Sequence, residues 1–286
     1  MATLAATVSR LCAASRRRYM DPYKAIAWPD ALDQNAWYFT PELISLYGTP
    51  FWDTLGEAQR KRLSQYEALN FFSLNIHGER PLVEGLAQRV YRKESAVITP
   101  YLQHFLDEEN KHMVYFGGFC TRYFGRVYPE KKLNLPREFL PGEADFLFFA
   151  KVLVFEEIVD VYNVAMAKDE RLAPIARRIN QLHHAEESRH LGFGRLMVAE
   201  LFQRYAPTWP AEHLGETRVY LGEYLRATWR EYYNPDAYRD AGIPDPYGAR
   251  AMALEDPRQA EHRRQVSARC LDYLKKQHMV EEDLAL

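Results

Sequence analysis

The chain has 286 residues and a formal net charge of −2, from 37 Lys and Arg against 39 Asp and Glu, so no basic surface marks a nucleic acid partner. Hydrophobic residues make up 47% and aromatic residues 14%, which excludes an intrinsically disordered chain. Three scattered cysteines form no CxxC pair, so a reducing, cytoplasmic compartment is expected. The most apolar stretch, residues 146–155, contains Lys151 and is too short to span a membrane.

The N-terminal segment, residues 2–19, is rich in arginine and has no acidic residue. This composition is typical of a mitochondrial presequence, and also of a plain N-terminal helix that packs on the protein or frays. The helix is favoured because aromatic-rich sequence continues directly from Met20, and the presequence stays as the alternative.

Apolar periodicity predicts an almost entirely helical protein. Between residues 40 and 205, apolar side chains recur at spacings of three and four, without the alternation that strands show. Thr40 followed by Pro41 has the residue types of a helix start. We expect long helices over residues 57–93, 96–124, 143–168 and 171–205, then helices from 207 to 233 and from 257 to 277, with a loop over 234–246.

The connections between these helices predict the topology. Short polar turns near residues 94 and 169 should form two antiparallel hairpins, and residues 125–142, with three prolines, form one long crossover. Two hairpins joined by one crossover is the connectivity of ferritin-like four-helix bundles. The expected fold is therefore all-α, in a single domain 1–286, with a bundle core over 57–206 and flanking segments 1–56 and 207–286 that cover it.

Two Glu-x-x-His units provide the first candidate metal ligands. They are Glu109 with His112 in the second expected bundle helix, and Glu187 with His190 in the fourth. At a spacing of three, both side chains lie on one helix face and can offer an oxygen and a nitrogen to one metal ion. The pair is informative because each unit lies in the middle of the second arm of a hairpin.

A metal site inside a four-helix bundle also needs one carboxylate from the first helix of each hairpin, at the same level along the bundle axis. Counting back from the two turns reaches Glu79 in the first hairpin, with Glu84 as its rival, and Glu156 or Glu157 in the second. Val152 and Leu153, one helical turn before Glu156, are apolar, so this face of the helix is expected to be buried. A buried acid there needs a compensating cation. Pro81 removes a backbone donor beside this site, so the first helix is expected to kink or restart.

The fourth helix carries a third candidate imidazole. His183 precedes Glu187 by four residues and His190 by seven, so all three share one face. His183 is predicted to join His190 at the metal pair, with a core histidine as the alternative reading, and His184 points away and is structural. Glu108 and Glu186, each directly before a ligand glutamate, are expected to accept the far N–H of a ligating imidazole across the bundle, with solvated helix acids as the alternative, and Asp160 is a further candidate for contact with the ligating residues.

The chemistry of this ligand set favours iron or manganese. Four glutamates and two or three histidines, without a thiolate, suit these ions and argue against structural zinc. We therefore expect two iron ions, with a manganese/iron pair not distinguished by ligand type. O₂ would be the co-substrate, and an external electron donor protein or reductant would supply electrons. Replacing His183 is expected to impair turnover more than folding.

The set Glu79, Glu109, His112, Glu156, Glu187 and His190 resembles the ferritin-like diiron-carboxylate superfamily over about 130 residues. The His183-x-x-x-Glu187-x-x-His190 pattern is most similar to the para-aminobenzoate N-oxygenase family, whose site has a third histidine. In that family the first two carboxylate ligands lie further apart in the sequence. The same interval would put the first ligand near Leu74 here, which implies a short deletion in this hairpin. The resemblance implies O₂-dependent oxidation of an arylamine or related small amine, through a diiron-peroxo intermediate.

As a hypothesis, Glu79, Glu109 and His112 hold one ion, while Glu156, Glu187, His190 and His183 hold the other. Phe116 and Asn163, each seven residues after a ligand, are candidates for contact with a small amine or aromatic substrate. Alternatives are a diiron hydroxylase or desaturase acting on a C–H bond, and a metal-free helical interaction module. A homodimer is left open.

Overall fold

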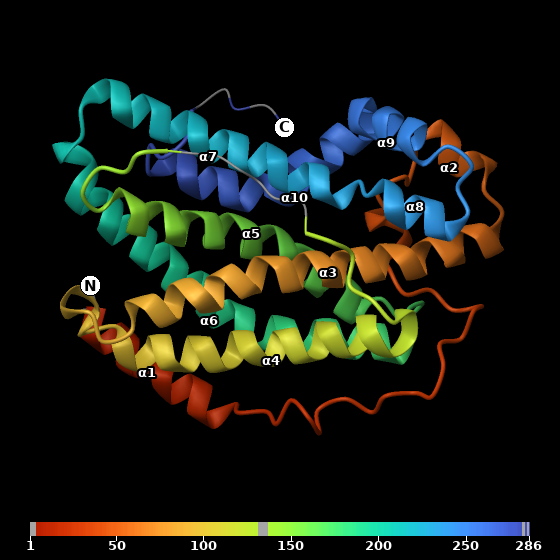
Figure 1. Cartoon of the computed structure of the whole chain (residues 1–286), viewed down its shortest axis with the longest axis horizontal. Coiled ribbons are helices and arrows are strands. Elements are labelled where there is room, and N and C mark those ends of the chain that lie inside the picture. Colours follow the sequence, from red (N-terminus) through yellow and green to blue (C-terminus); the bar gives the residue numbers. More distant parts are fainter. Residues whose placement is uncertain (1–3, 131–136, 282–283, 285) are drawn as a thin grey trace.

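The computed structural model describes residues 4–130, 137–281, 284 and 286, and it is helical, with a lone bridge between Trp37 and Leu172 as the β pairing among these residues (Figure 1). The all-α prediction is confirmed. The longer helices before the C-terminal region are α1 (Leu4–Arg17), α3 (Glu57–Arg89), α4 (Thr99–Phe124), α5 (Glu143–Lys168) and α6 (Pro174–Tyr205). Short α2 (Pro50–Thr54) lies between α1 and α3, and Pro41 begins only a three-residue 3-10 turn.

Helices α3 to α6 form the predicted four-helix bundle. α3 packs along α4 and α5 along α6, and α3–α5 and α4–α6 contacts close the bundle (Figure 1). α3 ends four residues earlier than predicted because Val90 is extended and Tyr91 has a φ of 62°. α6 begins at Pro174, three residues later than predicted, because proline is favoured in the first helical turn.

Pro81 does not interrupt α3, which continues for 33 residues from Glu57 to Arg89. The predicted restart at this proline is therefore not observed. Proline removes a single backbone hydrogen bond, and the contacts of α3 with α4, α5 and α8 on its flanks offset that loss.

The predicted loop over 234–246 is wrong, because it contains α8 (Pro235–Ala241). Its signals are local: the Asn234 side chain accepts the Asp236 N–H, Pro235 takes the first helical position, and Gly242 ends the helix with a φ of 87°. α7 (Ala211–Tyr232), α9 (Pro246–Glu255) and α10 (Pro257–Lys276) complete the C-terminal region.

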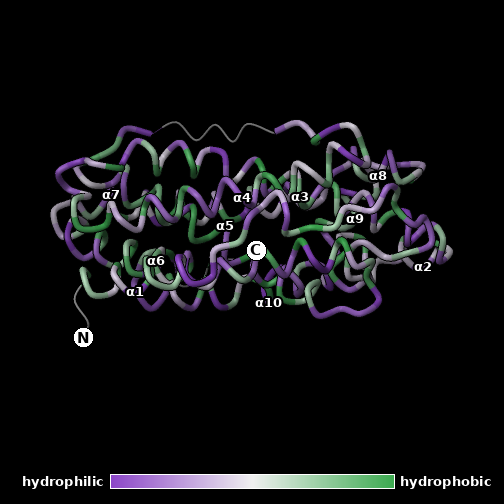
Figure 2. The backbone as a smooth tube through the Cα atoms, turned by 90° about the horizontal axis from the view of Figure 1, so that it is seen from below, coloured by the Kyte–Doolittle hydropathy of each residue, from purple (hydrophilic) through white to green (hydrophobic). Residues whose placement is uncertain are grey.

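The flanking helices cover the bundle on several sides. α7 and α10 pack on α5, α8 packs on α3, and α1 packs on α4 through buried Val8 and Cys12. Seen from below, these helices run along the long axis of an elongated body (Figure 2). Packing of α1 agrees with the N-terminal helix interpretation, and the presequence stays a prediction. No described helix is long and apolar enough to cross a membrane.

Two glycines of α3 bring it close to α5. A Cβ atom on Gly78 would lie 2.4 Å from the Phe155 ring, and one on Gly85 would lie 2.1 Å from the Phe148 ring. Real side chains do not approach so closely, so both rings occupy space that only glycine leaves free. These contacts fix how far α5 is shifted along α3, and therefore the position of residues such as Glu156, which follows Phe155.

Candidate metal centre

Seven acidic and imidazole side chains meet in the middle of the bundle, and none exposes more than 3% of its surface. α3 and α5 contribute one carboxylate each, α4 contributes one Glu-x-x-His unit, and α6 contributes the other together with a third imidazole. They are Glu79, Glu109, His112, Glu156, His183, Glu187 and His190. The structure thus brings together all the residues that the sequence predicts as metal ligands.

The two Glu-x-x-His units face one another across the bundle. His190 Nδ1 lies 2.8 Å from Glu109 Oε1 and 3.3 Å from Glu187 Oε1. His112 Nδ1 lies 3.5 Å from Glu109 Oε2 and 3.5 Å from Glu187 Oε1. One potential ligand atom from each of these four residues lies within 4.8 Å of the others, which is close enough for one ion.

A second group consists of Glu79, His112 and His183. His183 Nε2 lies 3.5 Å from Glu79 Oε1 and 2.9 Å from Glu187 Oε1. The structure therefore places His183 with the ligands of the first hairpin, which differs from the predicted grouping with Glu156 and His190. α6 lies beside α4, so one face of α6 can reach both ends of the cluster.

The donor set fits a cation because several of its buried atoms have no hydrogen-bond partner. The atoms are Glu79 Oε1 and Oε2, Glu109 Oε1, His112 Nδ1, Glu156 Oε1 and Glu187 Oε2. Unpaired buried carboxylates are costly, and their convergence with imidazole nitrogens is what a metal ion compensates.

The four glutamates of the cluster fall into two pairs, one with raised and one with lowered pKa values. Burial, with the neighbouring carboxylates, raises the pKa of Glu79 and of Glu156 well above the ordinary value. Burial also acts to raise the pKa of Glu109 and Glu187, but the adjacent histidines outweigh it and lower both. Without a cation, the cluster therefore retains protons on its outer acids, Glu79 and Glu156.

The acids that precede the two ligand glutamates bind the far side of the imidazoles. His112 Nε2 donates to Glu186 Oε2 at 3.0 Å, and His190 Nε2 donates to Glu108 Oε2 at 2.8 Å. Burial opposes ionisation of Glu108, but His190 and Arg189 lower its pKa to about 2. Both Nε2 atoms are thus occupied by hydrogen bonds, so the two Nδ1 atoms face the cluster.

Sequence reasoning missed the basic residues behind these acids. Arg189 Nη2 donates to Glu108 Oε1 at 2.7 Å, and Lys111 Nζ lies 3.9 Å from Glu186 Oε1. The signal was available, because the pattern Glu-Glu-x-(Lys or Arg)-His occurs at residues 108–112 and again at 186–190. Each basic residue follows its ligand glutamate by two positions and points outward from the cluster.

Both predicted pocket residues contact His183 in the structure. Asn163 Nδ2 donates to His183 Nδ1 at 2.7 Å, and the Phe116 ring packs edge-on against the imidazole at a centroid distance of 4.9 Å. Burial lowers the pKa of His183, so its imidazole is neutral and can offer a lone pair.

Several candidates lie outside the cluster. Glu84, the rival first ligand, is exposed and accepts from Gln88, because it lies five residues beyond Glu79 and points to another face of α3. Asp160 is wrong as a partner of a cluster histidine, since it contacts the Nδ1 atom of His184 at 2.6 Å. Glu157 pairs with Arg195 and Arg269 on the outer side of α5.

The sequence profile described as p-aminobenzoate N-oxygenase AurF matches residues 2–277. The chain belongs to this family. The predicted family resemblance is therefore confirmed over nearly the whole chain, and with it the prediction that the chain belongs to a family of oxygenase enzymes.

Similar proteins include uncharacterized proteins from Mycobacterium tuberculosis and Mycobacterium bovis, 24% identical over 197 residues. The match covers 65% of this chain and 58% of these relatives, so the chain matches less than two thirds of their length. Among solved structures, the R2-like ligand-binding oxidase from Sulfolobus acidocaldarius has 17% identity and a TM-score of 0.46, with 97% of this chain and 93% of that one covered.

Proposed function

We propose that the protein is an O₂-dependent oxygenase with two iron ions, and that it oxidises the nitrogen of an arylamine or related small amine. The observation that carries the proposal is the group of unpaired carboxylate oxygens and imidazole nitrogens buried between α3, α4, α5 and α6. Membership of the p-aminobenzoate N-oxygenase family supports oxidation at nitrogen. A manganese/iron pair would use the same residue types.

The ligands would divide between the two groups seen in the structure. Glu109, Glu187 and His190 would hold one ion, and Glu79, His112 and His183 the other, because the one inward lone pair of His112, on Nδ1, can bind a single ion; Glu156 lies beside Glu187. When bound, the metal pair would supply the redox chemistry that activates O₂, and the protein supplies orientation and access. For oxidation of an amine to a hydroxylamine, R–NH₂ + O₂ + 2e⁻ + 2H⁺ gives R–NHOH + H₂O, so an external reductant must provide two electrons.

The chain's own residues prepare the imidazoles for this role. Glu108 and Glu186 hold the Nε2 protons of His190 and His112, which keeps both Nδ1 lone pairs directed inward. Asn163 can do the same for His183: turning its amide would let Oδ1, which has no partner, accept the Nδ1 proton and leave the Nε2 lone pair facing Glu79.

The test is iron per chain, measured by elemental analysis on the purified protein and on Glu109→Ala and His190→Ala. We expect about two ions in the parent and loss of iron in both variants, because each removes a residue of the four-membered group. The matched control is His184→Ala, which removes the neighbouring imidazole that contacts Asp160 instead of the cluster. It should leave the iron content unchanged.

Turnover distinguishes nitrogen oxidation from other oxygenase reactions. With O₂ and a chemical reductant, the parent should convert arylamines to hydroxylamine products, followed by mass spectrometry, and Glu109→Ala should not. A purified protein that holds no iron and takes up none under anaerobic conditions would overturn the proposal. Hydroxylation at carbon with an untouched amine would overturn its nitrogen specificity alone.

A further inference from the structure

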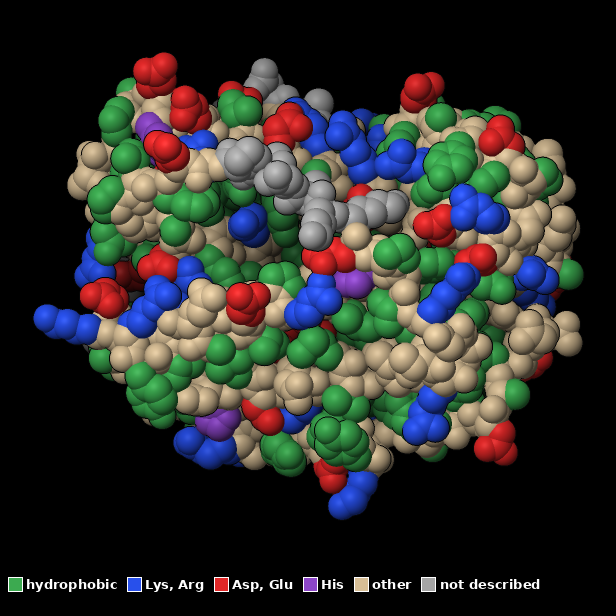
Figure 3. Space-filling model, in the orientation of Figure 1, with side chains coloured by type: hydrophobic (Ala, Val, Ile, Leu, Met, Phe, Trp, Pro, Cys, Tyr) green, Lys and Arg blue, Asp and Glu red, His purple; other side chains and the backbone are tan. Residues whose placement is uncertain are grey.

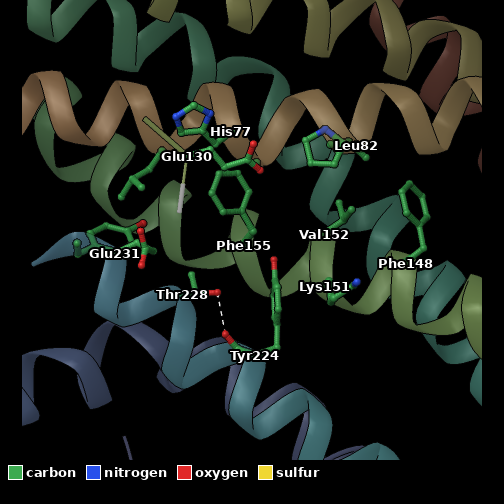
Figure 4. Close-up of a pocket in the computed structure, with 14 residues that line it drawn as sticks. His77, Leu82, Glu130, Phe148, Lys151, Val152, Phe155, Tyr224, Thr228 and Glu231 are labelled. Atoms are coloured by element: carbon green, nitrogen blue, oxygen red, sulfur yellow. Dashed lines mark hydrogen bonds between the residues drawn. The ribbon is translucent and has the colours of Figure 1, made fainter. Parts of the chain in front are cut away.

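A cavity of about 270 Å³ lies between α3, α5 and α7, separate from the metal cluster. Its walls are mainly apolar and aromatic, and the residues that matter below are Leu82, Phe148, Lys151, Val152, Phe155 and Tyr224 (Figure 4). The space-filling view shows a hollow in this region, between α3 and α7, with a basic side chain inside and hydrophobic side chains around it (Figure 3). A mainly apolar and aromatic lining with a few polar groups is that of a small-molecule site.

The cavity is adjacent to the cluster through one residue on each of two helices. Gly78 lines it and directly precedes Glu79, and Phe155 lines it and directly precedes Glu156. The Phe155 ring rests on Gly78, where a Cβ atom would be only 2.4 Å away. This ring therefore forms a wall of the cavity, and the residues that directly follow Gly78 and Phe155 along α3 and α5 belong to the cluster.

Lys151 gives the cavity a basic side chain. Its side chain is half-buried, and no carboxylate of the described residues lies within ion-pair distance of it. Its ammonium instead lies 5.9 Å from the ring centres of Tyr220 and Tyr224. Burial lowers the pKa of Lys151, which indicates that the charged form lacks compensation.

Two other basic side chains near the sites, Lys111 and Arg80, have acidic partners. Buried Lys111 lies 2.6 Å from Asp107, and the Glu130 carboxylate at the opposite end of the cavity accepts from Arg80. Figure 4 shows Lys151 and Phe148 at one end, Glu130 and Glu231 toward the other, and Phe155 between them. An anion is thus attracted to the end with Lys151.

We propose that this cavity binds the substrate as an apolar organic anion, with the acidic group at Lys151 and the apolar body against Val152 and Phe155. The proposal rests on the proposed oxygenase function and assigns Lys151 as the residue that selects for an acid. The ligand lies along α5, so that the part in contact with Phe155 is the part nearest Glu156.

Binding is measured first, by calorimetry on the protein as purified and without reductant, so that no turnover occurs. The probes share one body: 4-phenylbutyrate, 4-phenylbutyramide and 4-phenylbutylamine. The acid should bind at least about tenfold more tightly than the amide, and the amine should bind most weakly. Lys151→Met should reduce the affinity of the acid by at least about tenfold and leave the amide unchanged.

The matched control is Lys168→Met, which removes an exposed lysine in the last turn of the same helix. It should leave the affinity of the acid unchanged. Equal binding of acid and amide, tightest binding of the amine, unchanged acid affinity in Lys151→Met, or no binding of the acid at millimolar concentration would each overturn the assignment.

Turnover links the cavity to the reaction. With 4-(4-aminophenyl)butyrate, Lys151→Met should raise KM by at least about tenfold, with kcat and iron content close to the parent values. An unchanged KM would overturn the substrate role. Acid binding through Lys151 in a protein without iron would overturn the oxygenase function, whereas a protein with two iron ions that binds no acid would overturn only the cavity assignment.

Discussion

The two hairpins of the bundle, α3–α4 and α5–α6, use the same five-residue pattern reciprocally. In residues 108–112 and 186–190, the first glutamate crosses the bundle to the histidine of the other hairpin, and the basic residue supports the other hairpin's glutamate. Each half therefore completes the outer contacts of its partner, and neither hairpin can orient its own imidazole alone.

The halves differ seven residues before each ligand histidine. The first hairpin has Phe105 there, whose ring stacks on His190 at a centroid distance of 4.1 Å. The second has His183, whose Nε2 faces Glu79 and Glu187. Equivalent positions thus serve packing in one half and face the cluster carboxylates in the other. The repeat supplies a symmetric frame, and this exchange of Phe for His makes the two proposed metal positions different.

The largest effect is expected from breaking the reciprocal contacts, because they are buried and charged. Glu108→Gln should lower the free energy of unfolding by about 3 kcal/mol, since buried Arg189 loses its closest carboxylate. Glu186→Gln should cost about 1 kcal/mol, because Lys111 keeps Asp107 at 2.6 Å. Urea unfolding of both variants and the parent measures the difference.

Iron affinity gives a second comparison of the Glu108→Gln and Glu186→Gln variants. Both variants should bind iron about 10–100-fold more weakly, because each replaces the charged carboxylate that accepts the far N–H of one ligand histidine by a neutral amide. Equal losses of stability in the two variants would contradict the different roles given to Arg189 and Lys111.

A smaller effect is expected from making the halves alike at the position seven residues before each ligand histidine. His183→Phe gives the second hairpin the residue of the first, and the new ring can keep the packing on Phe116. Turnover should fall at least about tenfold, while the free energy of unfolding changes by less than about 1.5 kcal/mol. Steady-state rates and urea unfolding test this, and a fully active variant would contradict the role of His183.

The smallest effect is expected at glycines that belong to neither the site nor the packing. A Cβ atom on Gly117 of α4 or on Gly192 of α6 would meet nothing within 4 Å. Gly117→Ala and Gly192→Ala should therefore each raise the free energy of unfolding by about 0.5–1 kcal/mol, through helix propensity. Thermal unfolding checks both, and a loss of stability in either would show that a contact of that helix is missing from this description.

Much of the fold could be predicted because its signals are local. The four long helices follow from apolar spacing, and the positions of Glu109, His112, Glu187 and His190 follow from counting along two hairpins of similar length. The failures are local too: the Asn234-Pro235 start of α8 was taken as part of a loop, although its cap residues are typical of a short helix.

The sequence by itself determined that two Glu-x-x-His units meet at one height, because hairpin geometry and helical periodicity depend only on neighbours along the chain. Only the tertiary structure decided which acids of the first arms face inward, since Glu79 and Glu84, or Glu156 and Glu157, differ only in rotation about their helices. It also decided that His183 lies beside Glu79, and that Lys151 lines a cavity with no acidic partner among the residues that the structure describes. Both depend on how α3, α5, α6 and α7 pack, and packing between distant segments leaves no periodic mark in the sequence.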